Sequence, residues 1–252
     1  MNQTMELLYK RKSVRAYEER PVPPEVKAEI IKAALRAPTA GNMMLYSILD
    51  ITDQAVKERL AETCDDQPFI AKAPLVLMFF ADYQRMYDYY NLCGVEKPVR
   101  TPQEGDLMLA CSDALIAAQN AVIAAEALGL GSCYIGDIME NYEVHKELLE
   151  LPEYVFPIGM VVFGYPTEQQ KERKQPDRYD ERFIVFENKY KRLQLNEFEE
   201  MFQKIHDNMR SFNQGKLEKN YGQIMYAKKY TAQFTQEMNR SVAEALKNWR
   251  RK

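Results

Sequence analysis

The sequence of 252 residues has few of the side chains on which most metal centres and nucleophilic active sites depend. It holds two histidines, both within expected polar helices, where a lone histidine is most often solvated or structural. Its four cysteines (Cys64, Cys93, Cys111 and Cys133) lie far apart without a Cys-x-x-Cys pair. This spacing argues against a zinc site and against a disulfide framework, so we expect no bound metal and a reducing compartment, the cytoplasm.

The common catalytic and membrane signatures are also missing. The sequence contains no phosphate-binding P-loop, no Gly-x-Gly-x-x-Gly after a strand, no nucleophile elbow and no His-Glu-x-x-His. No apolar run approaches the roughly 18 residues of a membrane span, and residues 1–15 lack the apolar centre of a signal peptide. If the protein is an enzyme, we therefore expect a bound cofactor to carry the reaction.

The composition is that of a globular protein, with 46% hydrophobic and 28% charged residues, which excludes intrinsic disorder and collagen-like structure. The net charge of −3 is unevenly distributed. From Lys189 onward, 14 basic residues face 7 acidic ones, whereas the preceding part carries 20 basic against 30 acidic residues. A basic tail can indicate contact with nucleic acid or a membrane, but it is more often a solvated helix face, and we expect neither partner.

Helical and strand patterns alternate without a regular βαβ repeat, which predicts the α+β class. The apolar run 74–81 is bounded by Pro74 and Asp82 and suits a strand buried on both faces. The Ala-rich segment 106–128 is apolar around much of its circumference, so we expect a central buried helix. The other expected helices are at 6–15, 24–37, 54–64 and 142–149, and the region 196–252 is expected to be wholly helical. We also expect strands at 47–52 and 155–163, a loop at 132–137 and an extended surface segment at 167–182.

Two segments have residues suited to binding a ligand. Arg11-Lys-Ser-Val-Arg15 places three cations and a hydroxyl within five residues, a combination that suits a phosphate but also a solvated basic patch. Arg36-Ala-Pro-Thr-Ala-Gly-Asn42 combines small residues, which let a backbone approach a flat ligand, with hydrogen-bonding side chains. Taken alone, the second segment also suits an ordinary loop that ends a helix.

Together, and in order, these segments resemble the FMN-dependent nitroreductase family over residues 5–192. Three further segments agree with that family. They are Gln67-Pro-Phe-Ile-Ala-Lys-Ala-Pro74 before the apolar strand, Ala124-Ala-Glu-Ala-Leu-Gly-Leu-Gly131 followed by Tyr134-Ile-Gly136, and Pro157–Pro166 followed by Lys171-Glu-Arg173. The resemblance implies a central mixed or antiparallel sheet flanked by helices in residues 1–192, with a helical C-terminal extension at 193–252.

The resemblance also implies a cofactor site for FMN. Its phosphate and ribityl chain would be held by Arg11, Ser13, Arg15, Lys171 and Arg173, with Lys12 in the same motif. Its ring would meet Thr39, Ala40, Gly41 and Asn42 on one side, Gln67 at the polar edge, and Tyr134, Ile135 and Gly136 elsewhere. Lys174 and Arg178 lie near the Lys171/Arg173 pair, so a shift of register would exchange them. In this family FMN lies in the interface of a homodimer, and the helix at 106–128 would be a main dimer element.

The implied activity is an oxidoreductase that passes a hydride from NADH or NADPH through flavin N5 to a small-molecule acceptor such as a nitroaromatic or a quinone. Alternatives are a specialised flavin reductase or dehalogenase, and a flavin-binding protein with little turnover that uses the basic tail as an interaction module. The sequence departs from the family at Met43 and Met44, where Gln and then Pro-Trp are common. Because methionine adapts to irregular surfaces, we expect the substrate side to differ in shape.

Overall fold

The computed structural model describes residues 2–212 and 219–250. By its internal contacts the chain divides into two compact units, one of residues 1–175 and 237–252 and the other of residues 176–236. The two units differ from the division after residue 192 that the sequence suggests. The separation of a flavin-binding part from a C-terminal extension at that position stays a prediction.

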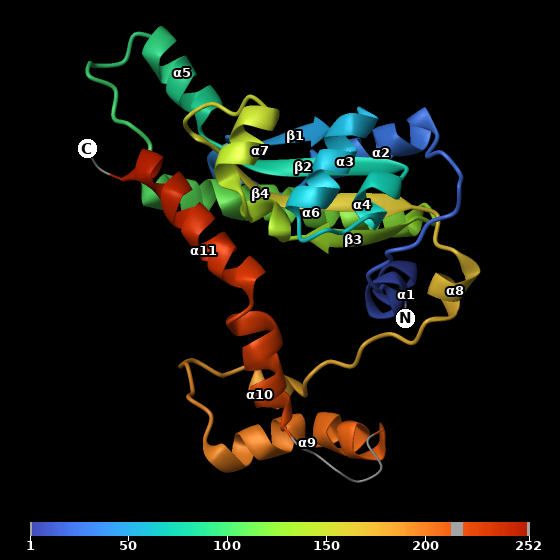
Figure 1. Ribbon diagram of the computed structural model, residues 1–252. Helices are drawn as coiled ribbons and strands as arrows, with labels where there is room; N and C mark the ends of the chain where they lie inside the picture. Colours follow the sequence, from blue (N-terminus) through green and yellow to red (C-terminus); the bar gives the residue numbers. More distant parts are fainter. Residues whose placement is uncertain (1, 213–218, 251–252) are drawn as a thin grey trace. The chain divides into compact units, whose positions relative to one another are not determined.

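The first unit is built on a four-stranded sheet, whose strands succeed one another in space as β1-β2-β4-β3 (Figure 1). The strands are β1 (Tyr46–Asp50), β2 (Leu75–Asp82), β3 (Gly131–Ile135) and β4 (Val155–Gly164). Every neighbouring pair is antiparallel. This arrangement confirms the α+β class and the expected central sheet, which is antiparallel in all its named strands.

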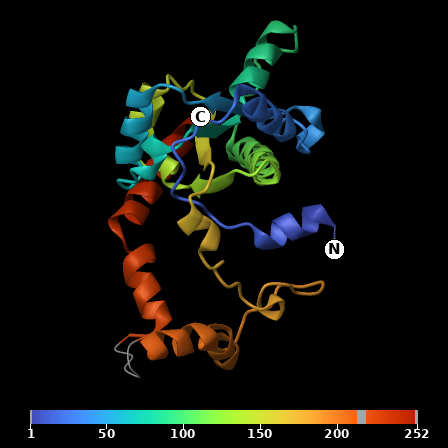
Figure 2. The same ribbon diagram turned by 90° about the vertical axis from the view of Figure 1, so that its right-hand side faces the viewer.

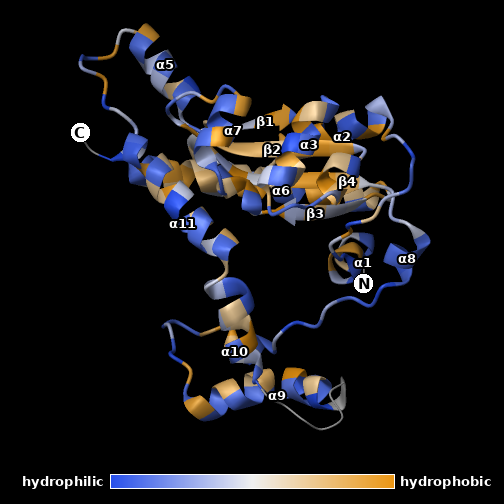
Figure 3. Cartoon of the chain, in the orientation of Figure 1, coloured by the Kyte–Doolittle hydropathy of each residue, from blue (hydrophilic) through white to orange (hydrophobic). Residues whose placement is uncertain are grey.

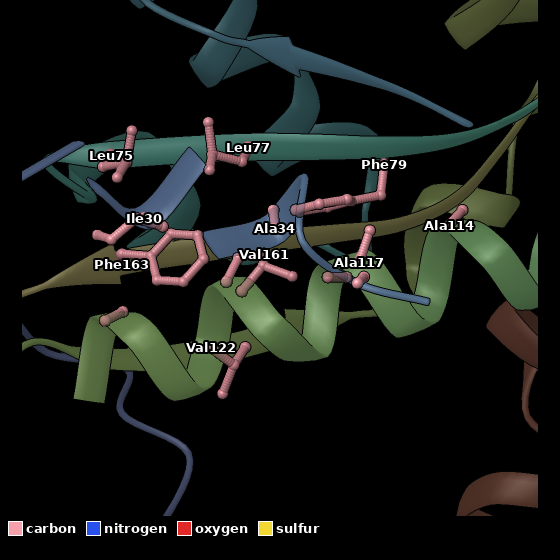
Figure 4. Packing of buried hydrophobic residues seen from close by; sticks show 14 of the residues in the cluster. Ile30, Ala34, Leu75, Leu77, Phe79, Ala114, Ala117, Val122, Val161 and Phe163 are labelled. Atoms are coloured by element: carbon pink, nitrogen blue, oxygen red, sulfur yellow. The ribbon is translucent and has the colours of Figure 1, made fainter. Parts of the chain in front are cut away.

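Strand β2 is buried along its whole length, because alternate side chains enter different cores on the two faces of the sheet. Leu75, Leu77 and Phe79 join the core formed with α2 (Pro24–Ala34) and α6 (Glu104–Ala127), as Figure 4 shows. The alternate residues join the core on the other face, with α3 (Gln54–Thr63) and α4 (Phe69–Lys72). The hydropathy colouring of Figure 3 shows the same concentration of apolar residues in the central strands β2 and β4.

Helix α6 packs its alanine-rich side against the sheet and begins at a capping box between Gln103 and Asp106. Its length and composition reach the range of a membrane span, which was not expected from the sequence. Nine of its residues are buried in the core of the first unit, as in a helix that organises a globular fold. Its exposed apolar side chains are Met108, Leu109, Leu115 and Ile116.

The C-terminal helix α11 (Gln233–Ala245) and the turn Leu246–Trp249 bring the chain back to the first unit (red in Figure 2). Trp249 is buried there, edge-on to Tyr154 with 5.4 Å between ring centroids. Residues 237–250 therefore contribute to a core of the sheet-bearing unit, although the sequence suggests that they belong to a separate extension.

The second unit contains α9 (Leu195–Phe212), α10 (Tyr221–Met225) and the π-helical turn Tyr226–Tyr230. Its aromatic core joins Phe202 of α9 to Tyr179 and Tyr221, each with 5.4 Å between ring centroids. The described part of 196–252 is largely helical, as the sequence predicts, and it is divided into several helices because Asn220 caps a new helix and Thr231 ends the π-helical turn. Residues 213–218 of that segment lie outside the described residues.

Three other elements differ from the sequence expectation. Helix α1 (Gln3–Lys10) ends five residues before Arg15, because the chain beyond it pairs with β3. A strand, β3, replaces most of the expected loop at 132–137. A short helix, α8 (Glu168–Glu172), lies within the segment expected to be extended. The remaining elements are α5 (Gln84–Leu92), α7 (Tyr142–Leu148) and the 3-10 turns at Ala40–Asn42, Asp137–Met139 and Glu181–Phe183.

Candidate functional site

The segment that follows α1 runs beside β3 and carries the first predicted cluster. Ser13 forms a parallel bridge with Ser132, and Val14 donates its N–H to the Ser132 carbonyl at 2.8 Å. This approach requires glycine at position 131, because a Cβ there would lie 2.4 Å from a methyl carbon of Val14. The backbone pairing thus fixes the predicted phosphate-binding segment against the edge of the sheet.

A second segment, residues 170–173, is tied to the first by crossed hydrogen bonds. Lys12 Nζ donates to the carbonyl of Lys171 at 2.6 Å and to the carbonyl of Arg173, while the Arg173 guanidinium donates to the carbonyl of Ser13. The Lys171 ammonium is held instead by two carboxylates, Glu168 at 2.6 Å and Glu18 at 3.4 Å. Lys12 therefore acts as a clamp between segments, and a direct cofactor contact from Lys171 stays a prediction.

The thiol of Cys133 in β3 is buried and is influenced by the charges of three guanidinium groups. Burial raises the pKa of this thiol, and the positive charges of Arg15, Arg11 and Arg173 oppose that rise. Among the described residues no carboxylate lies within 4.0 Å of Arg15 or Arg173, and Arg11 meets Glu126 only at that limit. The guanidinium groups of Arg11, Arg15 and Arg173, which we call the cation cluster, are thus largely without counter-charge.

Four buried polar atoms near this cluster have no hydrogen-bond partner within the described part of the chain: Arg11 Nε, Arg173 Nε, Ser132 Oγ and Glu126 Oε1. Buried polar groups are normally hydrogen-bonded, so the unpaired donors of Arg11, Arg173 and Ser132 indicate a group that the protein is built to receive. Two guanidinium donors and a hydroxyl suit a phosphate, which accepts several charge-assisted hydrogen bonds. The residues present therefore fit the phosphate end of a nucleotide-like cofactor.

The loop at 39–45, between α2 and β1, holds the second predicted cluster. Gly41, Asn42 and Met44 all have left-handed backbones, with φ of 54°, 56° and 50°. Thr39 and Ala40 bind the carboxylate of Asp113 in α6, the backbone N–H of Ala40 at 3.0 Å. Pro38 restricts the residue before it and marks where α2 has ended. The predicted residues Thr39–Asn42 thus form one tightly bent loop anchored to the central helix.

Gln67, which is predicted to meet the polar edge of the ring, lies beside the residues that follow β3. Its Nε2 donates to the Cys64 carbonyl at 2.8 Å and to Oδ2 of Asp137 at 2.7 Å. Because both partners are acceptors, the amide nitrogen is committed to them and Oε1 remains available as an acceptor. Asp137 directly follows Gly136, so Gln67 lies next to the predicted segment Tyr134–Gly136.

Along β3 the predicted side chains alternate between the two faces of the strand. Tyr134 is partly exposed and its hydroxyl donates to Gln119 of α6 at 3.4 Å, whereas Ile135 is buried in the core with α3. Tyr134 is therefore the residue of this segment whose side chain can reach a ligand.

Within one chain the predicted residues form separate groups along α6. Glu126, near the cation cluster, and Asp113, at the 39–45 loop, are thirteen residues apart on this helix. At about 1.5 Å per residue these two positions are roughly 20 Å apart along the helix axis. The cation cluster and the 39–45 loop thus lie at different places of the same protomer.

Three acidic residues of these groups were missed from the sequence: Asp113, Glu126 and Asp137. Asp113 had a detectable signal, because a lone acid within an apolar helix needs buried partners. Asp137 belongs to a pair of acids in which burial, and then the charges of Asp137 and Asp65, raise the pKa of Glu140 to about 8. No local pattern marks that pair, since its neighbours come from distant parts of the chain.

One of the two histidines, His145, lies in the core of the protein. His145 is fully buried, with Nδ1 2.9 Å from the Ile138 carbonyl and Nε2 2.7 Å from Thr63 Oγ1. Burial lowers its pKa, so it is a neutral structural residue near neutral pH. Among residues 2–212 and 219–250, no group of three or more His, Cys, Asp or Glu side chains is arranged to hold a metal ion.

Comparison with known proteins extends these observations. The sequence model of the nitroreductase family matches residues 8–165. The chain is 34% identical to a Bacillus subtilis protein named FMN reductase (NAD(P)H). The aligned region of 173 residues covers 69% of this chain and 70% of that protein. It is also 34% identical over 196 residues, 77% of each chain, to the oxygen-insensitive NADPH nitroreductase of Salmonella typhimurium. The solved structure of B. megaterium NfrA2 is 27% identical and covers 100% of both chains with a TM-score of 0.85.

Proposed function

The chain belongs to the nitroreductase family, and from this premise we propose that it is an FMN-dependent oxidoreductase that uses NADH or NADPH. The observation that carries the proposal is the group of buried, unpaired donors at Arg11, Arg173 and Ser132. Bound FMN would supply the redox chemistry, accepting a hydride at N5 and delivering reducing equivalents to a small acceptor such as a nitroaromatic or a quinone.

The phosphate end of FMN is assigned to the cation cluster. Arg11, Arg15 and Arg173 would offer guanidinium donors, and Ser13 would add a hydroxyl. Lys12 and Lys171 would contribute chiefly by holding the segment 170–173 against the segment 11–15, since Lys12 binds two of its carbonyls. This geometry supports a rigid anion site whose position depends on backbone pairing to β3.

The ring is assigned to the remaining predicted residues. Thr39, Ala40, Gly41 and Asn42 would supply a backbone surface of small residues on one side. Gln67 would accept a hydrogen bond from an N–H at the polar edge of the ring, because its amide nitrogen already binds Cys64 and Asp137. Tyr134, Ile135 and Gly136 would cover another part, with the Tyr134 ring as the exposed contact.

A complete site requires two chains in this proposal. The roughly 20 Å between the two groups along α6 would be bridged if the 39–45 loop of one protomer met the cation cluster of its partner. The exposed apolar side chains of α6 offer a surface for such a homodimer. We further propose a cytoplasmic enzyme in which residues 1–192 bind the flavin and residues 193–252 form a helical extension.

The proposal is tested by loading the purified protein with FMN and adding NADH or NADPH without oxygen. Bleaching of the flavin absorbance is the expected result, and a protein that cannot be loaded with FMN would contradict the proposal.

The phosphate assignment has its own test in the double variant Arg11→Ala/Arg15→Ala. Its affinity for FMN should fall by a few kcal/mol, since charge-assisted hydrogen bonds contribute about 1.5–3 kcal/mol each. Riboflavin, which lacks the phosphate, should bind as it does to the unmodified protein. The double variant Lys32→Ala/Arg59→Ala removes the same charge from exposed ion pairs and is the matched control. Unchanged FMN affinity in Arg11→Ala/Arg15→Ala would show that the phosphate lies elsewhere.

A further inference from the structure

Asp113 is a buried carboxylate in the middle of the apolar helix α6. Its neighbours on that helix, Ala110, Ala114 and Ala117, are fully buried. A carboxylate in such surroundings is costly unless it is well hydrogen-bonded. All the hydrogen-bond partners found for it come from a single segment outside its own helix, the 39–45 loop.

The carboxylate receives donors from both ends of that loop. Oδ1 accepts from the backbone N–H of Ala40 at 3.0 Å, and Oδ2 accepts from the Thr39 hydroxyl and from the N–H of Leu45 at 3.2 Å. The Thr39 oxygen in turn accepts from the N–H of Met44 at 2.9 Å. The Asp113 side chain thus closes the loop both directly and through the hydroxyl of Thr39.

The loop has a conformation that its own sequence does not favour. Two residues other than glycine, Asn42 and Met44, have left-handed backbones, which cost roughly 1–2 kcal/mol each for ordinary side chains. Asparagine tolerates this region, but the side chain of methionine cannot form a local hydrogen bond to compensate. The bonds to Asp113 hold the backbone at the two positions that flank this stretch, Ala40 and Leu45, and the bond to Thr39 holds Met44 itself.

We propose that Asp113 is a positioning residue that sets the shape of the flavin-facing loop without touching the flavin. The inference rests on the proposed function, because that function makes the loop a surface for the ring. It assigns the Thr39 proton to Asp113, so Thr39 meets a ligand through its methyl group and backbone rather than as a hydroxyl donor. The loop therefore contributes shape and backbone groups, and Asp113 decides where they lie.

The test replaces Asp113 by its isostere in the variant Asp113→Asn. An amide cannot accept hydrogen bonds on both of its heavy atoms, so either Ala40 or the pair Thr39 and Leu45 loses its acceptor. We expect the dissociation constants of FMN and riboflavin to rise together, by about tenfold or more. The visible circular dichroism of the bound flavin should change as well, because the ring meets a displaced backbone.

The two flavins separate this role from that of the cation cluster. Arg11→Ala/Arg15→Ala weakens FMN alone, whereas Asp113→Asn weakens both ligands by a similar factor. The matched control is Asp106→Asn on the same helix, which removes a cap and an ion pair with Arg100. This control is expected to lower stability while leaving the bound-flavin spectrum unchanged.

Wild-type affinities and a wild-type spectrum in folded Asp113→Asn would overturn the inference. If that variant does not fold, Thr39→Val and Thr39→Ser decide, because only serine keeps the hydroxyl that links Asp113 to Met44. Weakened binding of both flavins by Thr39→Val with recovery in Thr39→Ser supports the inference, and equal behaviour of the two contradicts it. Failure of the unmodified protein to bind either flavin would instead contradict the proposed function, and this inference with it.

Discussion

Glu126 is the carboxylate most affected by the cation cluster. It lies in the last turn of α6, largely buried, with Oε1 4.0 Å from Arg11 Nε. Burial raises the pKa of Glu126 to about 7, against the opposing charges of Arg11 and Lys12. Burial chiefly raises the pKa of the Tyr17 hydroxyl, and the charge of Glu126 adds to this rise. Glu126 therefore titrates closer to neutral pH than an ordinary glutamate does.

This titration predicts a pH-dependent stability. Because the pKa of Glu126 is higher in the folded protein than in the unfolded chain, its contribution is fully present in acid and lost as pH rises through about 7. We expect the free energy of unfolding of the flavin-free protein to fall between about pH 5 and about pH 8, and to fall less in Glu126→Gln. Chemical denaturation across this range measures both.

The control for this prediction is Glu29→Gln, which changes an exposed ion pair with Lys32 and should keep the full slope. The share of Glu140, whose pKa is raised to about 8, remains in both variants. An unaltered slope in Glu126→Gln would show that Glu126 is ionised throughout the range.

At the scale of elements, the site depends on how closely the chain after α1 approaches β3. Gly131→Ala would place a methyl group within 2.4 Å of Val14, so the segment must move. We expect a loss of about 1–3 kcal/mol in stability, as in other overpacked positions, together with weaker FMN binding because Ser13 moves too. Gly105→Ala in the first turn of α6 is the control, since its added carbon meets nothing within 4 Å. Thermal unfolding and FMN titration of the two variants are compared.

The sequence predicts elements best where local pattern and burial agree. The apolar runs of β2 and β4 and the alanine-rich α6 were anticipated, because each is buried by its own composition. Strand β3 was expected as a loop, since an edge strand with Ser132 and Tyr134 lacks a continuous apolar run. The early end of α1 could not be foreseen, because the residues after Lys10 are removed from the helix by pairing with a strand more than a hundred residues away.

The candidate site shows the same limit. Arg11, Ser13, Arg15 and the 39–42 loop were found from residue types that suit a phosphate and a flat ring. Asp113, however, acts on a loop some seventy residues earlier through side-chain geometry that no spacing rule encodes. The sequence therefore predicts residues that would face a ligand, and the fold is needed to find those that would position them.

At the scale of the whole molecule, the arginines of the cation cluster and the exposed apolar side chains of α6 belong to different segments of the chain. The arginines of the cation cluster belong to the part of the chain before Lys189, which has an excess of acidic residues. Counter-charge is thus plentiful in that part, yet among the described residues only Glu126 comes within 4.0 Å of Arg11, Arg15 or Arg173. Exposed apolar side chains also occur on α6, where Met108, Leu109, Leu115 and Ile116 lie on the helix that connects the two predicted halves of the flavin site.

This distribution predicts that dimer formation and flavin binding are lost together. Leu115→Glu places a charge on the exposed side of α6, and burying an unpaired charge in an interface costs several kcal/mol. We expect the unmodified protein to be a dimer in sedimentation, and Leu115→Glu to be a folded monomer that retains little FMN. Leu49→Glu is the matched control, because Leu49 on β1 is exposed to a similar fraction, 39% against 40%. It should remain dimeric and yellow. A monomer that binds FMN as tightly as the dimer would instead mean that one chain holds the whole site, with the 39–45 loop excluded from it.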